Sequence, residues 1–272
     1  MKKTVLITGS SSGIGRASVK YFQKKGWNVV ATMRKPEQEK ELTLLENVIC
    51  LKLDVTRPET IQKSIGQAIE RFGHIDAVVN NAGYGLFGPF ESTTREQVER
   101  QFNTNVFGVM EVVRQILPHF REKKEGTIIN ITSVGGRMTF PLFSLYHASK
   151  FAIEGFSESI HYELLPFNIR VKIVEPGAVR TEFMDRSSDR AGALAMDAYR
   201  SYVEKGTAYM DHAVQTEGSD PEVIARTIVK AASDASSRLR YAAGRDASIL
   251  LPLRKFIPDS VFLPIVRKRV MG

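Results

Sequence analysis

The sequence predicts an α/β fold, a single three-layer domain in which a doubly wound parallel β-sheet lies between two layers of helices. Short apolar runs rich in Val and Ile alternate with helical stretches as far as about residue 176, which is typical of repeated βαβ units. A glycine-rich turn separates the first apolar run from the first helical stretch. The 272 residues contain no repeat, low-complexity tract or interdomain linker, so we expect one domain over residues 1–272.

Composition excludes several other classes of protein. Hydrophobic residues make up 43% of the chain and charged residues 25%, which excludes a disordered, collagen-like or coiled-coil chain. The net charge is +8, but the basic residues are scattered rather than gathered in a stripe with aromatic residues, so we expect no nucleic-acid partner. A single cysteine allows no internal disulfide and fits a reducing, cytoplasmic location. The five histidines lack the spacing of metal ligands, so we expect no metal site.

The first part of the chain supplies strands and helices in alternation. The strands are short runs dominated by Val, Ile and Leu, and they are expected at 5–7, 28–33, 48–53 and 77–80. The helices between them are expected at 13–25, 37–45 and 58–72. Pro58 fits the first turn of the last of these helices, because proline already has a helical φ and an N–H at that position would have no partner.

The next part continues the alternation up to about residue 176. A long helix is expected at 94–123, where Gly126 follows its end, and another helix is expected at 145–164, ending near Pro166. Two more strands are expected at 127–131 and 170–174. Beyond residue 176, a helix is expected at 221–232 and a seventh strand at 240–243.

Two segments near the C-terminus depart from this alternation. Residues 182–218 are polar and irregular, and we expect a substrate-binding lid over about 183–218. The tail, about 247–272, has apolar runs that charged residues and prolines interrupt, so none reaches the ~20 residues of a membrane-spanning helix. We expect the tail to cover the substrate site or to pack on a neighbour. Peripheral contact with an anionic membrane, through the basic residues of the tail, is the alternative.

The glycine-rich turn is the first motif that carries chemistry. Gly9, Gly13 and Gly15 lie between the first strand and the first helix with the spacing G-x-x-x-G-x-G. Glycines let the backbone approach a pyrophosphate closely, and a helix N-terminus supplies N–H donors and the positive end of a dipole. The motif therefore predicts a Rossmann-type dinucleotide site, with a simple tight turn as the alternative.

The end of the second strand indicates which dinucleotide binds. An acidic residue at this place would accept hydrogen bonds from the ribose of NAD, but the sequence has Arg34 and Lys35. A guanidinium can pair with the 2′-phosphate of NADP, which an acidic residue would repel. Arg34 therefore favours NADP(H) as the cofactor; the alternative is that both cations are solvated loop charges.

A tyrosine, a lysine and a serine form the candidate catalytic group. Tyr146 and Lys150 are four residues apart in a predicted helix, so their side chains share one face. The lysine charge is expected to favour phenolate, which would lower the pKa of Tyr146 and make it a usable acid or base. Ser133 directly follows a predicted strand, at the sheet edge where ligands gather, and its hydroxyl could hydrogen-bond a substrate carbonyl. His147 is expected to point to another face.

Together these motifs resemble the short-chain dehydrogenase/reductase family, in its shorter single-domain branch. The resemblance extends over residues 4–182, with the pieces in the order and spacing of the family. The matching pieces are Thr8 to Gly15, Asp54 and Val55, Asn80 to Gly83, Asn105, Ser133, Tyr146 to Lys150, Pro176, Gly177 and Thr181. The sequence looks most similar to 17-beta-hydroxysteroid and retinol dehydrogenase-like members.

The resemblance implies a role for each residue of the cofactor site. The pyrophosphate and ribose would be held by Gly9, Ser11, Gly13, Ile14 and Gly15, and the adenine by Asp54 and Val55. The rest of the cofactor would be backed or flanked by Asn81, Ala82, Gly83, Pro176, Gly177, Val179 and Thr181. Members that prefer NADP often carry a basic residue where this chain has Ser12, so Arg34, with help from Arg16, would recognise the 2′-phosphate.

The resemblance also implies the catalytic roles. Ser133 would orient the substrate carbonyl, and Tyr146 would exchange the proton with it. Lys150 would hold the nicotinamide ribose and lower the pKa of Tyr146, and Asn105 would position a water beside Lys150. The family transfers hydride without a metal. Its helices corresponding to 94–123 and 145–165 pack between subunits, so a homodimer or homotetramer is implied.

The segment between Ser133 and Tyr146 must line the substrate site. Its apolar residues predict a lipophilic carbonyl or alcohol as substrate, such as a steroid or a retinoid. The candidate substrate-binding residues are Ser133, Gly135, Met138, Phe140, Phe143 and Tyr146. Two other functions stay open: a 3-oxoacyl-(acyl carrier protein) reductase, and a non-catalytic NADP-binding sensor or scaffold.

Overall fold

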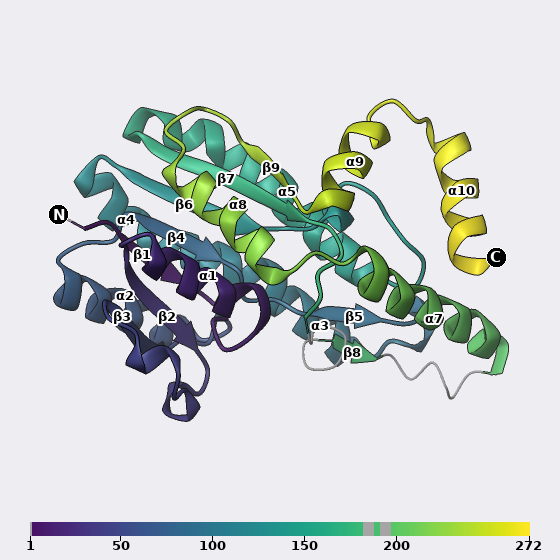
Figure 1. Cartoon of the computed structure of the whole chain (residues 1–272), viewed down its shortest axis with the longest axis horizontal. Helices are drawn as coiled ribbons and strands as arrows, with labels where there is room; N and C mark the ends of the chain where they lie inside the picture. The colour runs from purple at the N-terminus through teal and green to yellow at the C-terminus, as the bar shows by residue number, and fades with distance from the viewer. Residues whose placement is uncertain (1, 182–187, 191–196) are drawn as a thin grey trace.

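A parallel seven-stranded sheet organises the part of the chain that the computed structural model describes, residues 2–181, 188–190 and 197–272 (Figure 1). The strands are β1 (Thr4–Ile7), β2 (Asn28–Met33), β3 (Val48–Lys52), β4 (Ala77–Asn80), β6 (Gly126–Ile131), β7 (Ile169–Pro176) and β9 (Arg240–Ala243). Their order in the sheet is β3-β2-β1-β4-β6-β7-β9, and every neighbouring pair is parallel.

The strand order reverses between β1 and β4. From β1 the chain adds β2 and β3 on one side, and from β4 it adds the remaining strands on the other side. In such doubly wound sheets, ligands bind in the crevice beyond the carboxyl ends of the strands at this switch point. The predicted α/β fold is confirmed. We therefore expect the functional side chains beyond the carboxyl ends of β1 and β4 and their neighbours.

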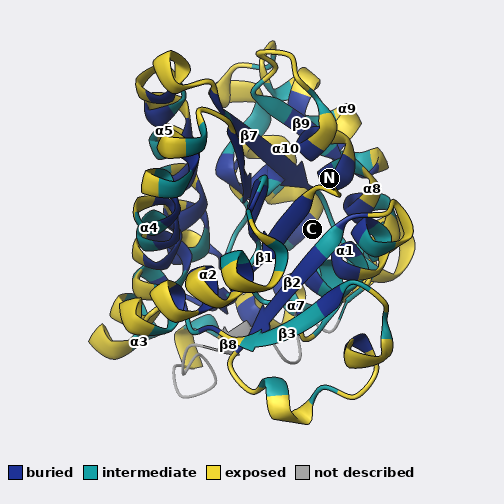
Figure 2. Cartoon of the chain, turned by 90° about the vertical axis from the view of Figure 1, so that its left-hand side faces the viewer, coloured by how far each residue is buried: buried dark blue, intermediate teal, exposed yellow. Residues whose placement is uncertain are grey.

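Helices cover both faces of the sheet and make the outer two layers (Figure 2). On one face lie α1 (Gly13–Lys24) and α8 (Pro221–Ser233), which pack on each other. On the other face lie α2 (Pro58–Phe72), α4 (Gly108–Lys123) and α5 (Ser144–Leu164), whose buried residues form one cluster with the strands. The central strands β1, β4 and β6 are buried on both faces, which is why they are nearly continuous apolar runs rather than alternating ones.

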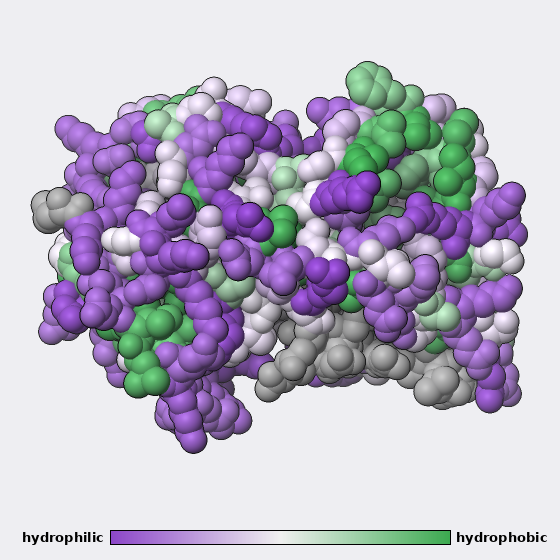
Figure 3. Space-filling view, in the orientation of Figure 1, coloured by the Kyte–Doolittle hydropathy of each residue, from purple (hydrophilic) through white to green (hydrophobic). Residues whose placement is uncertain are grey.

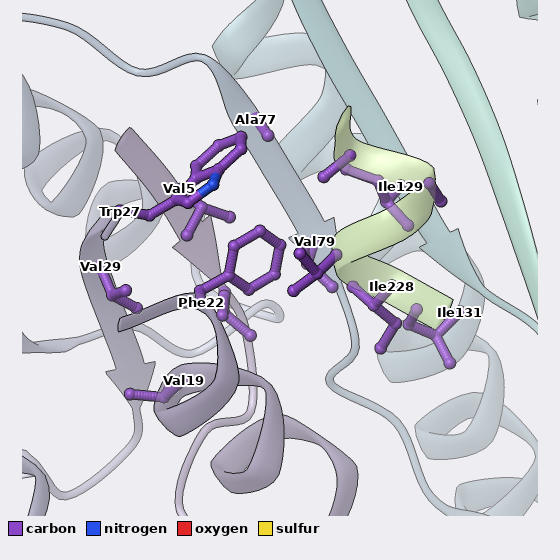
Figure 4. Close-up of a cluster of buried hydrophobic side chains, with 14 of the residues drawn as sticks. Val5, Val19, Phe22, Trp27, Val29, Ala77, Val79, Ile129, Ile131 and Ile228 are labelled. Atoms are coloured by element: carbon purple, nitrogen blue, oxygen red, sulfur yellow. The ribbon is translucent and has the colours of Figure 1, made fainter. Parts of the chain in front are cut away.

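The core beneath α1 shows how the sequence fixes this packing (Figure 4). Phe22 of α1 and Trp27, which precedes β2, meet edge to face with ring centroids 5.1 Å apart. Both pack on strand residues such as Val5 and Val79, and Ile228 of α8 joins the same cluster. Burying each large side chain of this kind contributes about 1.5–3 kcal/mol, so the cluster fixes α1, and with it the glycine-rich turn, against the sheet.

The predicted helix at 37–45 is wrong. The structure has only two single turns there, Pro36–Gln38 and Leu42–Leu44. The carboxylate of Glu39 accepts the backbone N–H groups of Glu41 and Leu42, both at 2.9 Å, and so competes with the helical hydrogen bonds that these groups would otherwise make. Leu42 is buried in the core and holds the segment down.

The predicted long helix at 94–123 is interrupted. It consists of α3 (Arg95–Phe102), one π-helical turn (Asn103–Phe107) and α4. Gly108 begins α4 where a side chain could not fit, because a Cβ would lie 2.7 Å from the Val55 side chain. The wide turn adds a residue to the helix and carries Asn105; such bulges are frequent at functional sites.

The segments expected as lid and tail contain helices. Within the expected lid lies α7 (Arg200–Glu217), and Ser188–Arg190 (β8) pairs with Gly85–Phe87 (β5); residues 182–187 and 191–196 lie outside the described residues. The tail forms α9 (Arg245–Arg254) and α10 (Asp259–Met271).

The three prolines of the tail act differently from one another. Pro258 separates α9 from α10, whereas Pro252 and Pro264 lie inside the two helices. Pro252 is in the last turn of α9, and Pro264 is exposed, so the carbonyl that loses its partner there faces water. The tail thus forms two short helices rather than one. Among the described helices, none combines the length and the apolar character needed to cross a bilayer.

Candidate active site

The candidate catalytic side chains meet beyond the carboxyl end of β6. Ser133 follows β6 and caps the short turn Val134–Gly136 by accepting the N–H of Gly135 at 3.0 Å. Tyr146 lies in the first turn of α5 and hydrogen-bonds the Ser133 side chain. One turn later, Lys150 is buried and donates from Nζ to the carbonyl of Ile131 at 2.9 Å, and Nζ lies 5.7 Å from the centre of the Tyr146 ring. The structure therefore brings Ser133, Tyr146 and Lys150 together.

The protonation of this group differs from the expectation. Desolvation raises the pKa of Tyr146, and the hydrogen bond from Ser133 opposes the rise without cancelling it. Burial also lowers the pKa of Lys150 to about 8, although the nearby Glu154 acts in the opposite sense. Desolvation of the phenol outweighs the hydrogen bond, so the predicted lowering of the Tyr146 pKa is wrong. The site holds a protonated phenol at neutral pH.

Asn105 is held beside Lys150 by the π-helical turn. Its side chain accepts the N–H of Tyr84 at 3.1 Å and donates to the Tyr84 carbonyl at 2.9 Å and to Ser149 Oγ at 3.2 Å. A Cβ added at Gly83 would lie 3.1 Å from Asn105 Oδ1 and 3.8 Å from Lys150 Nζ, so both groups border the same small space. The geometry suits the expected role of positioning a water there.

The glycine-rich turn forms a backbone cradle. Gly9 has a φ of +69°, and a Cβ on it would lie 2.9 Å from Ala82 Cα. A Cβ on Gly15 would lie 2.2 Å from the Gly9 carbonyl oxygen and 2.6 Å from Asn81 Nδ2. Asn81 holds the turn by donating to the carbonyls of Thr8 and Gly9 at 2.9 and 3.0 Å. The cradle leaves backbone exposed at the N-terminus of α1, which fits a pyrophosphate.

One cavity of about 1150 Å³ joins the cradle to the catalytic group. It is lined by all the residues expected to bind the cofactor: Gly9, Ser11, Gly13, Ile14, Gly15, Arg34, Asp54, Val55, Asn81, Ala82, Gly83, Tyr146, Lys150, Pro176, Gly177, Val179 and Thr181. The residues expected to bind substrate line it as well: Ser133, Gly135, Met138, Phe140 and Phe143. A volume of this size suits a dinucleotide together with a second molecule.

Arg34 and Arg16 have different surroundings. Arg34 follows β2 and lines the cavity. The guanidinium of Arg16 instead pairs with Glu39 at 2.6 and 3.1 Å and with Glu41 at 2.7 Å, and the ion pair lowers the pKa of Glu39 to about 2. Arg16 therefore holds the segment that follows β2, and the expectation that it would help to recognise a 2′-phosphate is wrong for this arrangement.

Asp246 is a site residue that the sequence analysis missed. It lies in the first turn of α9, and its Oδ2 accepts the N–H of Ala178 at 2.7 Å in the turn after β7. Gly177 must lack a side chain, because a Cβ there would lie 1.9 Å from the same oxygen. Asp246 thus fixes the turn expected to flank the nicotinamide. The sequence shows only an acidic residue at the start of a helix, 68 residues away from Ala178.

His147 is the second residue that was missed. It was expected to point away from the site, but its buried ring lies under the segment after Ser133 and lines the cavity. Nε2 accepts the N–H of Phe140 at 2.9 Å, and Nδ1 lies 2.9 Å from the carbonyl of Gly135, to which its N–H donates in the neutral tautomer that this pair of contacts selects. His147 thereby ties together two residues expected to bind substrate.

The far part of the cavity is mainly apolar, and α7, α9 and α10 build it. Phe143, which is buried, packs with Phe87 of β5 at 5.0 Å between ring centroids, and Val203 of α7 joins the cluster. The side chains that α7, α9 and α10 contribute to the cavity include Met210, Val214, Leu250, Phe262, Ile265 and Val266. A nonpolar molecule that fills this part would exclude water from Tyr146.

Comparison with known proteins identifies the family. The profile of the short chain dehydrogenase family matches residues 3–192, and the chain belongs to this family of oxidoreductases. An uncharacterised oxidoreductase of Schizosaccharomyces pombe is 43% identical over 240 residues, covering 88% of this chain and 99% of the relative. A 3-ketodihydrosphingosine reductase of Bacteroides thetaiotaomicron is 41% identical over 181 residues, covering 66% of this chain and 65% of that protein.

Solved structures agree on the architecture. A crystal structure of a short-chain dehydrogenase from Streptomyces avermitilis has a TM-score of 0.84 and 34% identity, covering 98% of this chain and 96% of that one. ElxO, solved with NADP bound, has a TM-score of 0.75 and 28% identity over 91% of this chain and 99% of its own. A 3-ketoacyl-(acyl-carrier-protein) reductase from Brucella melitensis, complexed with NADH, has a TM-score of 0.76 and 25% identity over 91% and 98%.

Proposed function

We propose that this oxidoreductase uses NADP(H) to interconvert a ketone or aldehyde and an alcohol on a lipophilic substrate. The observation that carries the proposal is one cavity in which a backbone cradle for a pyrophosphate meets the group Ser133, Tyr146 and Lys150. The apolar lining on the far side of that group gives the class of substrate. Tyr146 hydrogen-bonds Ser133, and Lys150 Nζ lies 5.7 Å from the centre of the Tyr146 ring. The presence of all three side chains in one group argues against a sensor or scaffold without turnover.

In the reducing direction, the protein transfers one proton to the substrate, and a bound nicotinamide would supply the hydride. Ser133 orients the substrate carbonyl, and Tyr146 gives the proton to its oxygen as the carbonyl carbon is reduced. The raised pKa of Tyr146 keeps the phenol protonated at neutral pH, which suits an acid. Lys150 holds its charge beside the ring and stabilises the phenolate that the transfer leaves behind. Oxidation of an alcohol uses the same groups in reverse.

The preference for NADP rests on Arg34. Its guanidinium lines the cavity at the end of β2, in the place where an NAD site has an acid. Among structurally similar proteins, ElxO is solved with NADP and the Brucella reductase with NADH, so the family fold accepts both dinucleotides. The charge at residue 34 supports the choice of NADP for this chain.

The proposal of a lipophilic substrate depends on the side chains that line the cavity. Met138, Phe140 and Phe143 line the cavity that contains the catalytic group, and α7 and α10 continue the apolar wall. A relative named for 3-ketodihydrosphingosine, a long-chain ketone, supports the same class. Steroids and retinoids share this combination of an apolar body and one carbonyl or hydroxyl. A 3-oxoacyl-(acyl carrier protein) reductase is the second candidate, and the Brucella structure supports it.

A panel of carbonyl compounds tests the proposal. NADPH oxidation is followed with long-chain, steroid and retinoid carbonyls, with short polar ketones and with an acyl-carrier-protein thioester. We expect kcat/KM to rise with the apolar size of the substrate and to be higher with NADPH than with NADH. Turnover of the thioester above all free lipids would establish the second candidate instead. Binding of NADPH without turnover of any carbonyl or alcohol would contradict the proposal.

A further inference from the structure

The outer face of α9 and α10 carries a cluster of exposed apolar side chains. We call it the C-terminal apolar surface; its residues are Ile249, Leu253, Phe256, Val261, Leu263 and Ile265, which are 47–85% exposed. In the space-filling view it is the green area at the upper right, over the two helices (Figure 3). Phe256, at 85%, is the most exposed of the set and lies in the bend between the helices.

The same two helices form a wall of the cavity. On α10, Phe262, Val266 and Val270 follow a spacing of four residues and line the cavity, whereas Val261 and Leu263 face outward. Ile249 and Ile265 belong to both the lining and the exposed surface. The C-terminal apolar surface and the far part of the cavity therefore lie on opposite sides of the same helices, and Ile249 and Ile265 connect them.

The charges of the segment that carries this surface are one-sided. Residues 247–272 contain five basic residues and one acid, Asp259. Asp259 pairs with Arg254, and Arg269 pairs with Glu217 of α7. Lys255, Arg267 and Lys268 are exposed beside the apolar side chains.

We infer that the C-terminal apolar surface docks on a lipid bilayer that contains anionic lipid. Exposed apolar side chains bordered by basic residues match the boundary between acyl chains and phosphate headgroups. The two short helices would lie in the interface, because neither can cross a bilayer.

A second copy of the chain is a poorer match than a bilayer. A twofold contact through this surface would bring Lys255, Arg267 and Lys268 of two copies together, and Asp259, the acid in this segment, already has a partner. If the proposed function is right, docking would also turn the apolar end of the cavity toward the lipid that holds the substrate.

The first test measures binding by flotation with vesicles of phosphatidylcholine alone and of phosphatidylcholine mixed with phosphatidylglycerol. The full-length protein is expected to float with the mixed vesicles and much less with the neutral ones. The variant Phe256→Glu/Leu263→Glu should lose most of this binding. Leu44→Glu is the matched control, because Leu44 is 83% exposed but far from the tail, and it should bind as the wild type does. Thermal unfolding shows that each variant is folded.

The second test separates charge from apolar contact. Neutralising Lys255, Arg267 and Lys268 to Gln should weaken binding to anionic vesicles on the order of 100-fold, since each basic residue near such a surface contributes about fivefold. Neutralising Lys24, Lys63 and Lys230, which are exposed on other helices, should change binding little. Neither test requires turnover, so a failure of docking is distinguishable from a failure of the proposed function.

Two results would overturn the inference. The first is no flotation of the folded wild-type protein with anionic vesicles. The second is a fall in oligomer mass when Phe256 and Leu263 are changed to Glu in the absence of lipid, which would assign the surface to a contact between copies of the chain.

Discussion

At the scale of single residues, the site depends on side chains that act through the backbone as much as on those that face a ligand. His147 has no expected role in proton transfer, yet its two ring nitrogens bind the backbone at Gly135 and Phe140. No pattern in the sequence shows this, because the residue after Tyr146 points away from the tyrosine on a helix, and only the folded segment 135–140 brings a partner to it.

Replacing His147 should loosen the substrate wall. In His147→Phe the Phe140 N–H loses its acceptor, and an unsatisfied part-buried donor costs about 1–3 kcal/mol of unfolding free energy. We expect KM for a bulky substrate to rise more than kcat falls, while the affinity for NADPH stays close to that of the wild type. His147→Gln, which can still accept and donate, should recover part of the KM. An equal loss in both variants, or a loss confined to kcat, would contradict a positioning role.

His147 also predicts a dependence of stability on pH. Burial lowers its pKa below the ordinary value of 6.5, so the folded protein takes up this proton less readily than the unfolded chain. The contribution to stability is therefore fully present above the ordinary pKa and is lost as pH falls through the lower, folded value. Unfolding curves in urea at pH 7.5 and 5.5 should show a smaller loss of stability for His147→Phe than for the wild type. Parallel losses would show that other groups cause the dependence.

Arg34 can be tested against its neighbour. Arg34→Ala should weaken NADPH binding by roughly 1.5–3 kcal/mol, the range for a hydrogen bond to a charged group, and should change NADH binding much less. Lys35→Ala changes the adjacent exposed cation and should have a small effect on either cofactor. The measurement is the dissociation constant of each dinucleotide by fluorescence titration. The same loss for both cofactors in Arg34→Ala would mean that this side chain does not recognise the 2′-phosphate.

At the scale of elements, local patterns predicted most strands and helices, and tertiary contacts explain the exceptions. The strands β1, β2 and β4 were predicted within a residue, because buried parallel strands are short runs of branched apolar residues. The bounds of β9 were predicted as well, although its sequence has no branched apolar residue. The segment 37–45 has a helical composition, but Glu39 takes the backbone donors there and Arg16 holds its carboxylate. The bonds from Glu39 to its neighbours are local, but Arg16 lies 23 residues away in the sequence, so no local pattern reveals that Glu39 is held in place.

Two further elements show the same limit. The π-helical turn at Asn103–Phe107 arises where α3 and α4 must both pack while Asn105 reaches Tyr84 and Ser149. The helix α9 supplies Asp246 to a turn that follows a different strand. The sequence shows both side chains, Asn105 and Asp246. It does not show that Asp246 accepts a hydrogen bond from Ala178.

The contact between α9 and the turn after β7 gives a prediction. Asp246→Ala removes the acceptor of the Ala178 N–H, so the turn that flanks the expected nicotinamide position should lose its fixed geometry. We expect the dissociation constant for the cofactor to rise about tenfold, within the ~1–3 kcal/mol range for such a loss. Asp246→Asn keeps an oxygen that can accept the bond and should bind more tightly than the alanine variant. Wild-type affinity in Asp246→Ala would contradict this role.

At the scale of the whole molecule, the cavity combines a half that the sequence could predict with a half that it could not. The cofactor residues lie in short motifs next to strand ends, and parallel strands bring those ends to one edge of the sheet. The apolar half depends on α7, α9 and α10, which follow the region of recognisable motifs. The sequence of the tail shows apolar runs, whereas the segment that forms α7 is polar, and only the fold shows that one face of α10 lines the cavity.

The assembly state is predicted at this scale as well. Phe107, at the end of the π-helical turn before α4, and Phe151, within α5, are 59% and 45% exposed, which leaves apolar surface where the family resemblance places a subunit contact. We expect light scattering at micromolar concentration to give the mass of a homodimer or homotetramer. Phe107→Glu/Phe151→Glu should lower that mass, and Leu44→Glu should not. A monomeric wild-type protein would contradict the prediction.

In the proposed NADPH-dependent carbonyl reduction, Tyr146 exchanges the proton with the substrate. The most direct measurement is the rate of NADPH oxidation with a lipophilic carbonyl by the wild type and by Tyr146→Phe, together with the NADPH dissociation constant of each. The substitution removes one hydroxyl and leaves the ring in place. We expect a fall in kcat of about 10²–10⁴-fold, the typical contribution of a general acid, with cofactor affinity almost unchanged. A folded Tyr146→Phe variant with a kcat near that of the wild type would contradict it.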